Sequence, residues 1–168
     1  MILNSFPPVA QSDALILILG SMPSEQSLSQ QQYYAHARNA FWRIITELFH
    51  LPSTLSYPEK LAALTEKQIA LWDVIQSCER VGSLDSDIKS IVNNDFSKFF
   101  IEHPNIKHLF FNGSCAYNEY QKRILQTLEP QWQTLPRTGL PSTSPAMASL
   151  SFTEKLNTWQ QITHCLNQ

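Results

Sequence analysis

Residues 15–42 read LILILGSMPSEQSLSQQQYYAHARNAFW, and this stretch decides the class of fold. The apolar run from Ala14 to Leu19 is typical of a buried strand, and it stops at Gly20. A long polar loop without helix or strand period follows, and it leads into two tyrosines, a histidine, an arginine and an asparagine. Open α/β sheets build their sites at the carboxyl ends of strands, and unstructured loops of this length are usually functional or disordered. The aromatic residues argue against disorder, so we expect a loop that belongs to a binding site.

The rest of the chain alternates between predicted strands and predicted helices. Buried strands are expected at 69–74 and 106–111, and a fourth, edge strand at 133–135. Helices are expected to begin near Asn39, to cover 58–64 and 95–101, to follow a cap at Ser114, and to follow a capping box of Ser151 and Glu154. The last helix carries one apolar stripe through residue 166. This alternation predicts an α/β fold with three layers, α/β/α, around a central, mostly parallel four-stranded sheet.

Composition limits the class of protein. The 168 residues suit a single domain, 1–168, and the net charge of −2 gives no overall attraction to nucleic acid, so DNA contacts must come from a local basic face or from backbone N–H groups. No apolar run approaches the roughly 20 residues of a membrane span, and the N-terminus lacks the order of a secretory signal. The three cysteines lie far apart, which fits buried side chains in a reducing cytosol. We therefore expect a cytoplasmic protein without a metal site or cofactor.

Glycine is scarce, and two of the four glycines follow predicted strands. Gly20 and Gly113 would lie on the same edge of a parallel sheet, where we expect the site. The loop after Gly20, residues 72–73 and residues 141–146 could converge there. Serine and threonine hydroxyls in 142–144 suit the binding of a phosphate, although a plain surface turn is the alternative.

Several segments together resemble the uracil-DNA glycosylase superfamily, and specifically its hypoxanthine-DNA (deoxyinosine) glycosylase branch. These segments are GSMPS at 20–24, YYAHARNAFW at 33–42, LWDVIQSCERVGSLDSDI at 71–88, FFNGSCAY at 110–117 and STSPA at 142–146. The resemblance covers nearly the whole chain and implies a four-stranded parallel sheet between helices. It also implies an enzyme that extrudes a damaged nucleotide from the stack and breaks its N-glycosidic bond.

Two residues of the tyrosine-rich loop are candidates for base binding and catalysis. Tyr34 lies where mismatch-uracil members of the superfamily carry an aromatic residue, and we expect it to stack on the base; the alternative is a tyrosine packed on the core. Asn39 matches an important asparagine of the hypoxanthine branch, and an amide can orient water while bonding a base or sugar oxygen. Its alternative role, the N-cap of the following helix, is compatible with catalysis.

The chain departs from the uracil-specific members at two motifs. Met22 stands where those members carry an aspartate or asparagine that activates water, and Leu140 or Ser142 stands in place of their histidine. A methionine performs no acid–base chemistry. Hypoxanthine is therefore favoured over uracil as the substrate, and Asn39 is the main candidate for catalysis. Asp73 is a candidate acceptor for the N1–H of hypoxanthine, or a carboxylate that caps a turn.

The remaining candidates are assigned to the base or to the DNA backbone. Gly20, Ser21 and Met22 are expected to border the base. Arg38 is a plausible phosphate contact, and His36 could meet a phosphate or serve only to shape its loop. The full set expected to contact DNA is Pro23, Ser24, His36, Arg38, Ser142, Thr143, Ser144, Pro145 and Ala146.

These observations favour a monomeric, monofunctional DNA glycosylase that excises a deaminated base, hypoxanthine first, from DNA. Water is the expected nucleophile because the motif segments contain no lysine to form a Schiff base. The alternatives are a mismatch-specific uracil or thymine glycosylase, and a damaged-DNA-binding protein of the same fold that has little or no catalytic activity.

Overall fold

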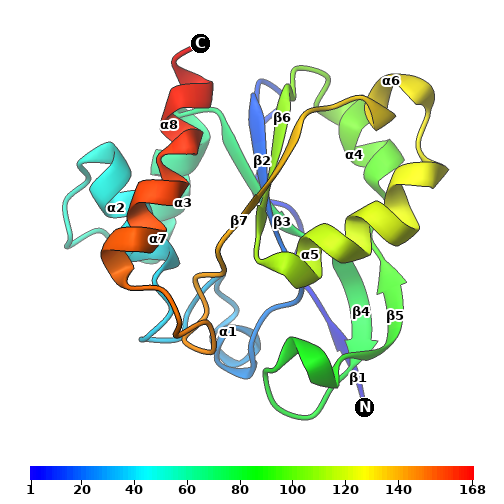
Figure 1. Ribbon diagram of the computed structural model, residues 1–168, viewed down its shortest axis with the longest axis horizontal. Coiled ribbons are helices and arrows are strands. Elements are labelled where there is room, and N and C mark those ends of the chain that lie inside the picture. The colour runs from blue at the N-terminus through cyan, green and yellow to red at the C-terminus, as the bar shows by residue number, and fades with distance from the viewer.

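A parallel four-stranded sheet forms the centre of the computed structural model, which describes residues 1–168 (Figure 1). Its strands run in the order β3-β2-β6-β7 and all neighbours are parallel. Their bounds are Ile69–Asp73 for β3, Ile16–Gly20 for β2, His108–Asn112 for β6 and Arg137–Leu140 for β7. The register places Gly20 opposite Asp73, so two of the candidate residues end neighbouring strands side by side.

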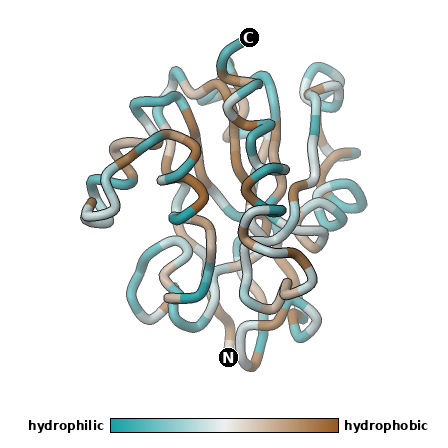
Figure 2. The backbone as a smooth tube through the Cα atoms, turned by 60° about the vertical axis from the view of Figure 1, so that its left-hand side comes forward, coloured by the Kyte–Doolittle hydropathy of each residue, from teal (hydrophilic) through white to brown (hydrophobic).

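Helices cover both faces of the sheet. The strands β2 and β3 send alternate side chains to opposite faces, and both strands are therefore buried along their whole length. Leu17, Leu19 and Phe111 belong to one apolar cluster, and Ile16, Ile18 and Phe110 belong to the other. Figure 2 shows the hydrophobic segments gathered in the middle of the molecule. The α/β fold in three layers, predicted from the alternation of elements, is confirmed.

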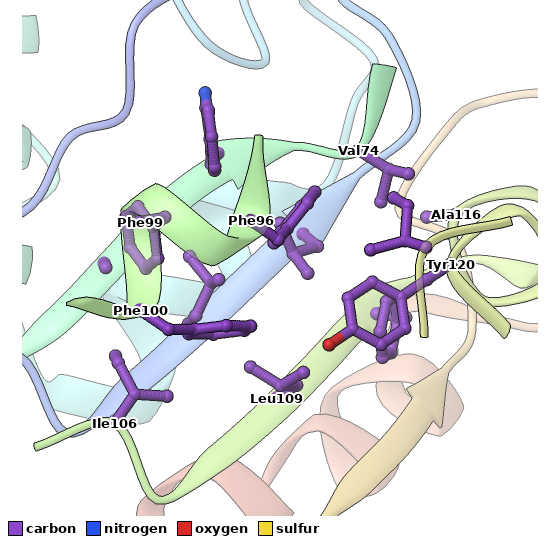
Figure 3. Packing of buried hydrophobic residues seen from close by; sticks show 14 of the residues in the cluster. Val74, Phe96, Phe99, Phe100, Ile106, Leu109, Ala116 and Tyr120 are labelled. Atoms are coloured by element: carbon purple, nitrogen blue, oxygen red, sulfur yellow. The ribbon is translucent and has the colours of Figure 1, made fainter. Parts of the chain in front are cut away.

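The first cluster packs under α4 (Phe96–Glu102) and α5 (Ser114–Glu119). Figure 3 shows the aromatic rings of α4 lying over the sheet beside Leu109 and Tyr120. The second cluster packs under four helices on the opposite side. These are α2 (Phe41–Phe49), α3 (Tyr57–Glu66), α7 (Phe152–Trp159) and α8 (Gln161–Leu166).

A second, antiparallel sheet lies beside the main one and was not predicted. It has the order β1-β4-β5, with β1 at Ile2–Asn4, β4 at Ile75–Glu79 and β5 at Lys89–Asn93. Met22, Ile75 and Cys78 form its small core. Because β4 begins two residues after β3 ends, the second sheet starts directly next to the carboxyl edge of the main sheet.

Several expected boundaries were wrong. Residues 133–135 are not a strand: α6 (Pro130–Gln133) occupies their start, and the edge strand is β7. The loop after Gly20 contains a short helix, α1 (Glu25–Gln30), whose first turn is capped by the Ser24 side chain. Ser114 is the first residue of α5 and Gly113 occupies the cap, with φ +97°.

The last predicted helix is two helices, α7 and α8, which meet at Gln160. Ser151 does cap α7, with its hydroxyl accepting from the Glu154 N–H at 3.1 Å. The Leu156, Trp159, Ile162 and Leu166 stripe still packs on one apolar cluster across the break. None of the helices combines the length and the apolar character that a membrane-spanning helix needs.

Candidate functional site

A cavity of about 290 Å³ opens at the carboxyl edge of the main sheet, where β2, β3 and β6 end. Twelve of the fifteen candidate residues line it. They are Gly20, Ser21, Met22, Pro23, Ser24, Tyr34, Asn39, Asp73, Ser142, Thr143, Ser144 and Ala146. His36, Arg38 and Pro145 do not line it. The three stretches expected to converge therefore meet around one cavity.

Gly20 brings two polar side chains of the cavity close together. A Cβ atom built on Gly20 would lie 2.6 Å from Asp73 Oδ1 and 2.8 Å from Tyr34 Oη. Both distances are shorter than real Cβ contacts, so glycine is required here by space. The carboxylate and the phenol hydroxyl consequently sit within 2.8 Å of the same point at the end of β2.

Asp73 is the most perturbed acid of the site. Its side chain is only 3% exposed, and Oδ2 is buried without a hydrogen-bond partner. Removal from water and, to a smaller extent, the charge of Asp85 raise the pKa of Asp73 to about 7, although Arg80 opposes the shift. Asp73 borders the cavity, and a buried carboxyl oxygen without a hydrogen-bond partner is unusual in a folded protein, so Asp73 is a functional-site candidate.

Tyr34 adopts a left-handed backbone conformation, with φ +56°, that side chains rarely take. Its ring stacks on Phe41, with centroids 4.1 Å apart and planes inclined by 21°. The hydroxyl is buried without a partner, and burial raises the pKa of Tyr34 together with the charge of Asp73. The aromatic residue is thus held from one side and borders the cavity.

Asn39 precedes α2, and its side chain is fixed by the first turn of that helix. Oδ1 accepts from the Phe41 N–H at 3.0 Å, and the Asn39 N–H donates to the His36 carbonyl at 2.9 Å. Ala40 occupies the formal cap position, so Asn39 stands one residue before the expected N-cap while still satisfying a helix N–H. Since Oδ1 faces a donor, the amide orientation is defined and Nδ2 is left as the free donor.

The serine-proline segment is fixed to the sheet edge and to α2. Thr143 is buried and pairs twice with Asn112: its N–H donates to Asn112 Oδ1 and its Oγ1 accepts from Nδ2, each at 2.9 Å. The Thr143 carbonyl accepts from the Ala40 N–H at 3.0 Å, which places the segment beside Asn39. Behind it, the buried Lys155 Nζ donates to the Met147 carbonyl at 2.7 Å, and Trp159 Nε1 donates to the Pro141 carbonyl at 2.9 Å.

Met22 differs in character from its neighbours. Its side chain is buried against Ile75 and Cys78, so it serves the core of the small sheet as well as bordering the cavity. His36 lies half-buried in its loop, where Nδ1 accepts from the Arg38 N–H at 3.1 Å, and Arg38 is exposed. No cluster of three or more His, Cys, Asp or Glu side chains is arranged to hold a metal ion.

Six residues that border the cavity were not among the candidates: Ser27, Tyr33, Ser83, Leu84, Asp85 and Met147. Asn112 also borders it, although the sequence offered only a turn-shaping role for this residue. The position of Asn112 directly after a buried strand and before a glycine was the available signal. The segment 83–85 gave no such signal, because it reaches the cavity through the unpredicted second sheet.

Comparisons with known proteins identify the family. The profile of the Uracil DNA glycosylase superfamily matches residues 7–163. The chain belongs to this superfamily. It is 39% identical over 119 residues to a protein of Methanosarcina barkeri named hypoxanthine DNA glycosylase, covering 70% of this chain and 75% of that one. A protein of the same name from Methanosarcina acetivorans is 37% identical over 137 residues, covering 81% and 85%.

A solved structure agrees with the fold over its full length. The solution NMR structure of a candidate uracil DNA glycosylase from Methanosarcina acetivorans superposes with a TM-score of 0.84 at 33% identity, and it covers 100% of both chains. The resemblance seen in the sequence motifs is therefore confirmed at the level of the superfamily.

Proposed function

We propose that this protein is a monofunctional DNA glycosylase that releases hypoxanthine from deoxyinosine in DNA. Two relatives at 37–39% identity bear the name hypoxanthine DNA glycosylase. The observation that carries the proposal within the molecule is the buried, unpaired carboxyl of Asp73 at a cavity of about 290 Å³, near the lower end of the usual size range of ligand sites. The cavity is therefore suited to one extruded nucleotide.

Asp73 supplies the chemistry that distinguishes hypoxanthine from adenine. Deamination changes the N1 position of the purine from an acceptor into an N–H donor, and a carboxylate accepts from such a donor. Adenine would place its N1 lone pair against the carboxylate, with no hydrogen between them. In this role the base satisfies the buried oxygen that has no partner in the protein.

Tyr34 provides an aromatic surface for the same base. Phe41 covers one face of its ring, and Tyr34 borders the cavity. Stacking on an aromatic side chain replaces part of the stacking that the base loses when it leaves the duplex. Because Gly20 has no side chain, Asp73 and Tyr34 can both lie against the end of β2 at the edge of the cavity.

Asn39 is the proposed catalytic residue. The C1′–N9 bond breaks with its electron pair leaving on the base, while the oxygen of a water forms the new bond to C1′. The water proton passes through solvent to the departing base, which leaves as neutral hypoxanthine. An amide does not remove that proton at neutral pH, but its fixed oxygen and free Nδ2 donors can orient the water and stabilise charge. No lysine borders the cavity, which agrees with hydrolysis rather than a Schiff-base lyase step.

The loops around the mouth are assigned to the DNA backbone. Ser24, Ser142, Thr143, Ser144 and Ala146 border the cavity and carry hydroxyl or N–H groups. Ser142 and Ser144 each accept a hydrogen bond from a backbone N–H within their own turn. Arg38 is exposed and directly precedes Asn39, which borders the cavity, so we assign Arg38 to a phosphate contact. The contacts fix the register of the duplex rather than read its sequence.

The test is release of free base from matched duplexes that contain one deoxyinosine, one deoxyuridine or one deoxyadenosine at the same position. We expect free hypoxanthine and an alkali-labile abasic site from the first duplex, and no free adenine from the third. The deoxyuridine duplex measures how much uracil the protein excises with Met22 in place of an aspartate or asparagine. No free base from any deaminated duplex would contradict the proposed function.

A further inference from the structure

Two acidic side chains border the cavity, and the function proposed above uses only one of them. Asp73 and Asp85 are the only acids among the bordering residues, and no lysine, arginine or histidine is among them. Asp73 is assigned to the base, and Asn39, the proposed catalytic residue, carries no charge. Asp85 is therefore a charged group at the reaction site that has no role so far.

The connection between β4 and β5, residues 80–88, places Asp85 at the rim of the cavity. Figure 1 shows this connection below β4 and β5, at the same end of the molecule as α1. Arg80, only 8% exposed, donates from Nε to the Gly82 carbonyl at 2.7 Å and from Nη2 to the Pro23 carbonyl at 2.6 Å. These bonds fix the start of the connection against the segment that follows β2.

The side chain of Asp85 is held in place by the same segment. Ser21 Oγ donates to Asp85 Oδ1 at 2.7 Å, and Ser21 directly follows the last residue of β2. Burial is the main cause of the raised pKa of Asp73 and of Tyr34, and the charge of Asp85 adds to both shifts. The field of the Asp85 carboxylate therefore reaches the polar groups that border the cavity.

Asp73 and Asp85 lie at different depths. Asp73 is 3% exposed, whereas Asp85 is exposed at the rim. An extruded nucleotide enters such a cavity with its base, while its sugar stays linked to the DNA backbone outside. A base bound at Asp73 therefore leaves its sugar nearer the rim, on the side of Asp85.

We infer that Asp85 is a second catalytic residue, whose carboxylate stabilises the positive charge that develops on the deoxyribose. The inference rests on the proposed function. When the C1′–N9 bond breaks with its electron pair leaving on the base, positive charge spreads over C1′ and O4′ of the sugar. Asp85 forms no bond and takes no proton in this step. Its fixed charge favours the charged transition state over the neutral substrate, so it accelerates the reaction without tightening substrate binding.

Asp85→Asn tests the inference, because it removes the charge and keeps an oxygen that can accept from Ser21 Oγ. Hypoxanthine release from a deoxyinosine duplex should be measured under single-turnover conditions over a range of enzyme concentrations. The maximal rate should fall at least about tenfold, less than the 10²–10³ typical of a water-excluded group because Asp85 is exposed. The enzyme concentration that gives half of the maximal rate should stay unchanged.

A second readout separates this role from a merely structural one. Two duplexes carry an abasic analogue at the lesion position, one a protonated pyrrolidine ring and the other a neutral tetrahydrofuran ring. The wild type should bind the pyrrolidine duplex more tightly, since its cation resembles the charged sugar. In D85N this preference should fall at least about fivefold, whereas a distorted cavity would weaken the binding of both duplexes alike.

Asp87→Asn is the matched control, because Asp87 is an exposed acid of the same connection that does not border the cavity. This variant should keep the wild-type rate and the wild-type preference for the cation. A wild-type rate in D85N would overturn the inference, and so would a slower D85N that keeps the full preference for pyrrolidine. If the wild type itself releases no hypoxanthine, it is the proposed function that fails.

Discussion

Replacement of Asp73 by asparagine should stabilise the protein at pH 8 and not at pH 4. Burial raises the pKa of Asp73 from 3.8 to about 7, so the native state holds this proton more tightly than the unfolded chain. Between pH 4 and pH 7 the unfolded chain has already lost the proton, and stability therefore falls as pH rises through this window. Roughly three pKa units correspond to about 4 kcal/mol, which is the upper limit of the loss.

Asparagine removes the charge but leaves an amide group in the position of the unpaired Oδ2. An unsatisfied buried polar group costs about 1–3 kcal/mol, so the net gain in the free energy of unfolding at pH 8 should be about 1–3 kcal/mol. The gain should be largely gone near pH 4, where Asp73 is protonated in the native state and about half protonated in the unfolded chain. The difference in stability between wild type and variant should thus change by several kcal/mol across this range.

Urea unfolding followed by the fluorescence of the four tryptophans, at intervals from pH 4 to pH 8, measures this difference. Asp87→Asn is the control, because it removes an exposed carboxylate from the nearby β4–β5 connection. Parallel pH–stability curves for wild type and Asp73→Asn would refute the reasoning. They would mean that Asp73 is not desolvated in the free protein.

Two further substitutions test the geometry around the cavity. Gly20→Ala places a Cβ 2.6 Å from Asp73 Oδ1, and the resulting overpacking of about 1–3 kcal/mol should lower kcat/KM for a deoxyinosine duplex. Gly139→Ala, whose Cβ would have its nearest contact at 3.6 Å, is the control and should leave kcat/KM unchanged. Equal activity of the two variants would contradict the close approach at Gly20. Lys155→Met removes the bond that holds the Met147 carbonyl and should lower stability by about 1–3 kcal/mol while raising KM more than it lowers kcat. Steady-state kinetics that show an unchanged KM would remove Lys155 from any role in positioning the loop.

The central strands could be predicted because they are buried on both faces. The apolar runs at 14–19, 69–74 and 106–111 correspond to β2, β3 and β6 within two residues, since such strands need apolar side chains at every position. The edge strand could not be placed in this way. In β7 only Leu140 is buried, so its sequence carries little strand signal, and the prediction fell on residues 133–135.

The antiparallel sheet was missed for a related reason. β1 has three residues, and β4 and β5 mix polar with apolar side chains, so no segment has a clear period. Each strand is stabilised by pairing with the others, which is a tertiary effect absent from any local window. The missed sheet also hid part of the cavity lining, because the connection between β4 and β5 brings residues 83–85 to the cavity.

The candidate site was largely predictable, because its residues lie in two motif loops and at the end of a buried strand. Gly20 and Asp73 lie side by side because β2 and β3 are parallel neighbours, an arrangement that the alternation of elements already favoured. Asn112 was underestimated because its place at the cavity depends on the reciprocal bonds with Thr143, 31 residues later. Such long-range pairing leaves no mark on the sequence of either segment.

The most direct test of the account is single-turnover release of hypoxanthine by the Asn39→Ala variant with enzyme in excess over a deoxyinosine duplex. The variant loses the acceptor for the Phe41 N–H, which should cost about 1 kcal/mol of stability and leave the fold intact. Its rate of base release should fall by about 10²–10³, the usual effect of removing one preorganised polar group at a reacting centre. A folded Asn39→Ala variant that releases hypoxanthine at the wild-type rate would contradict the account.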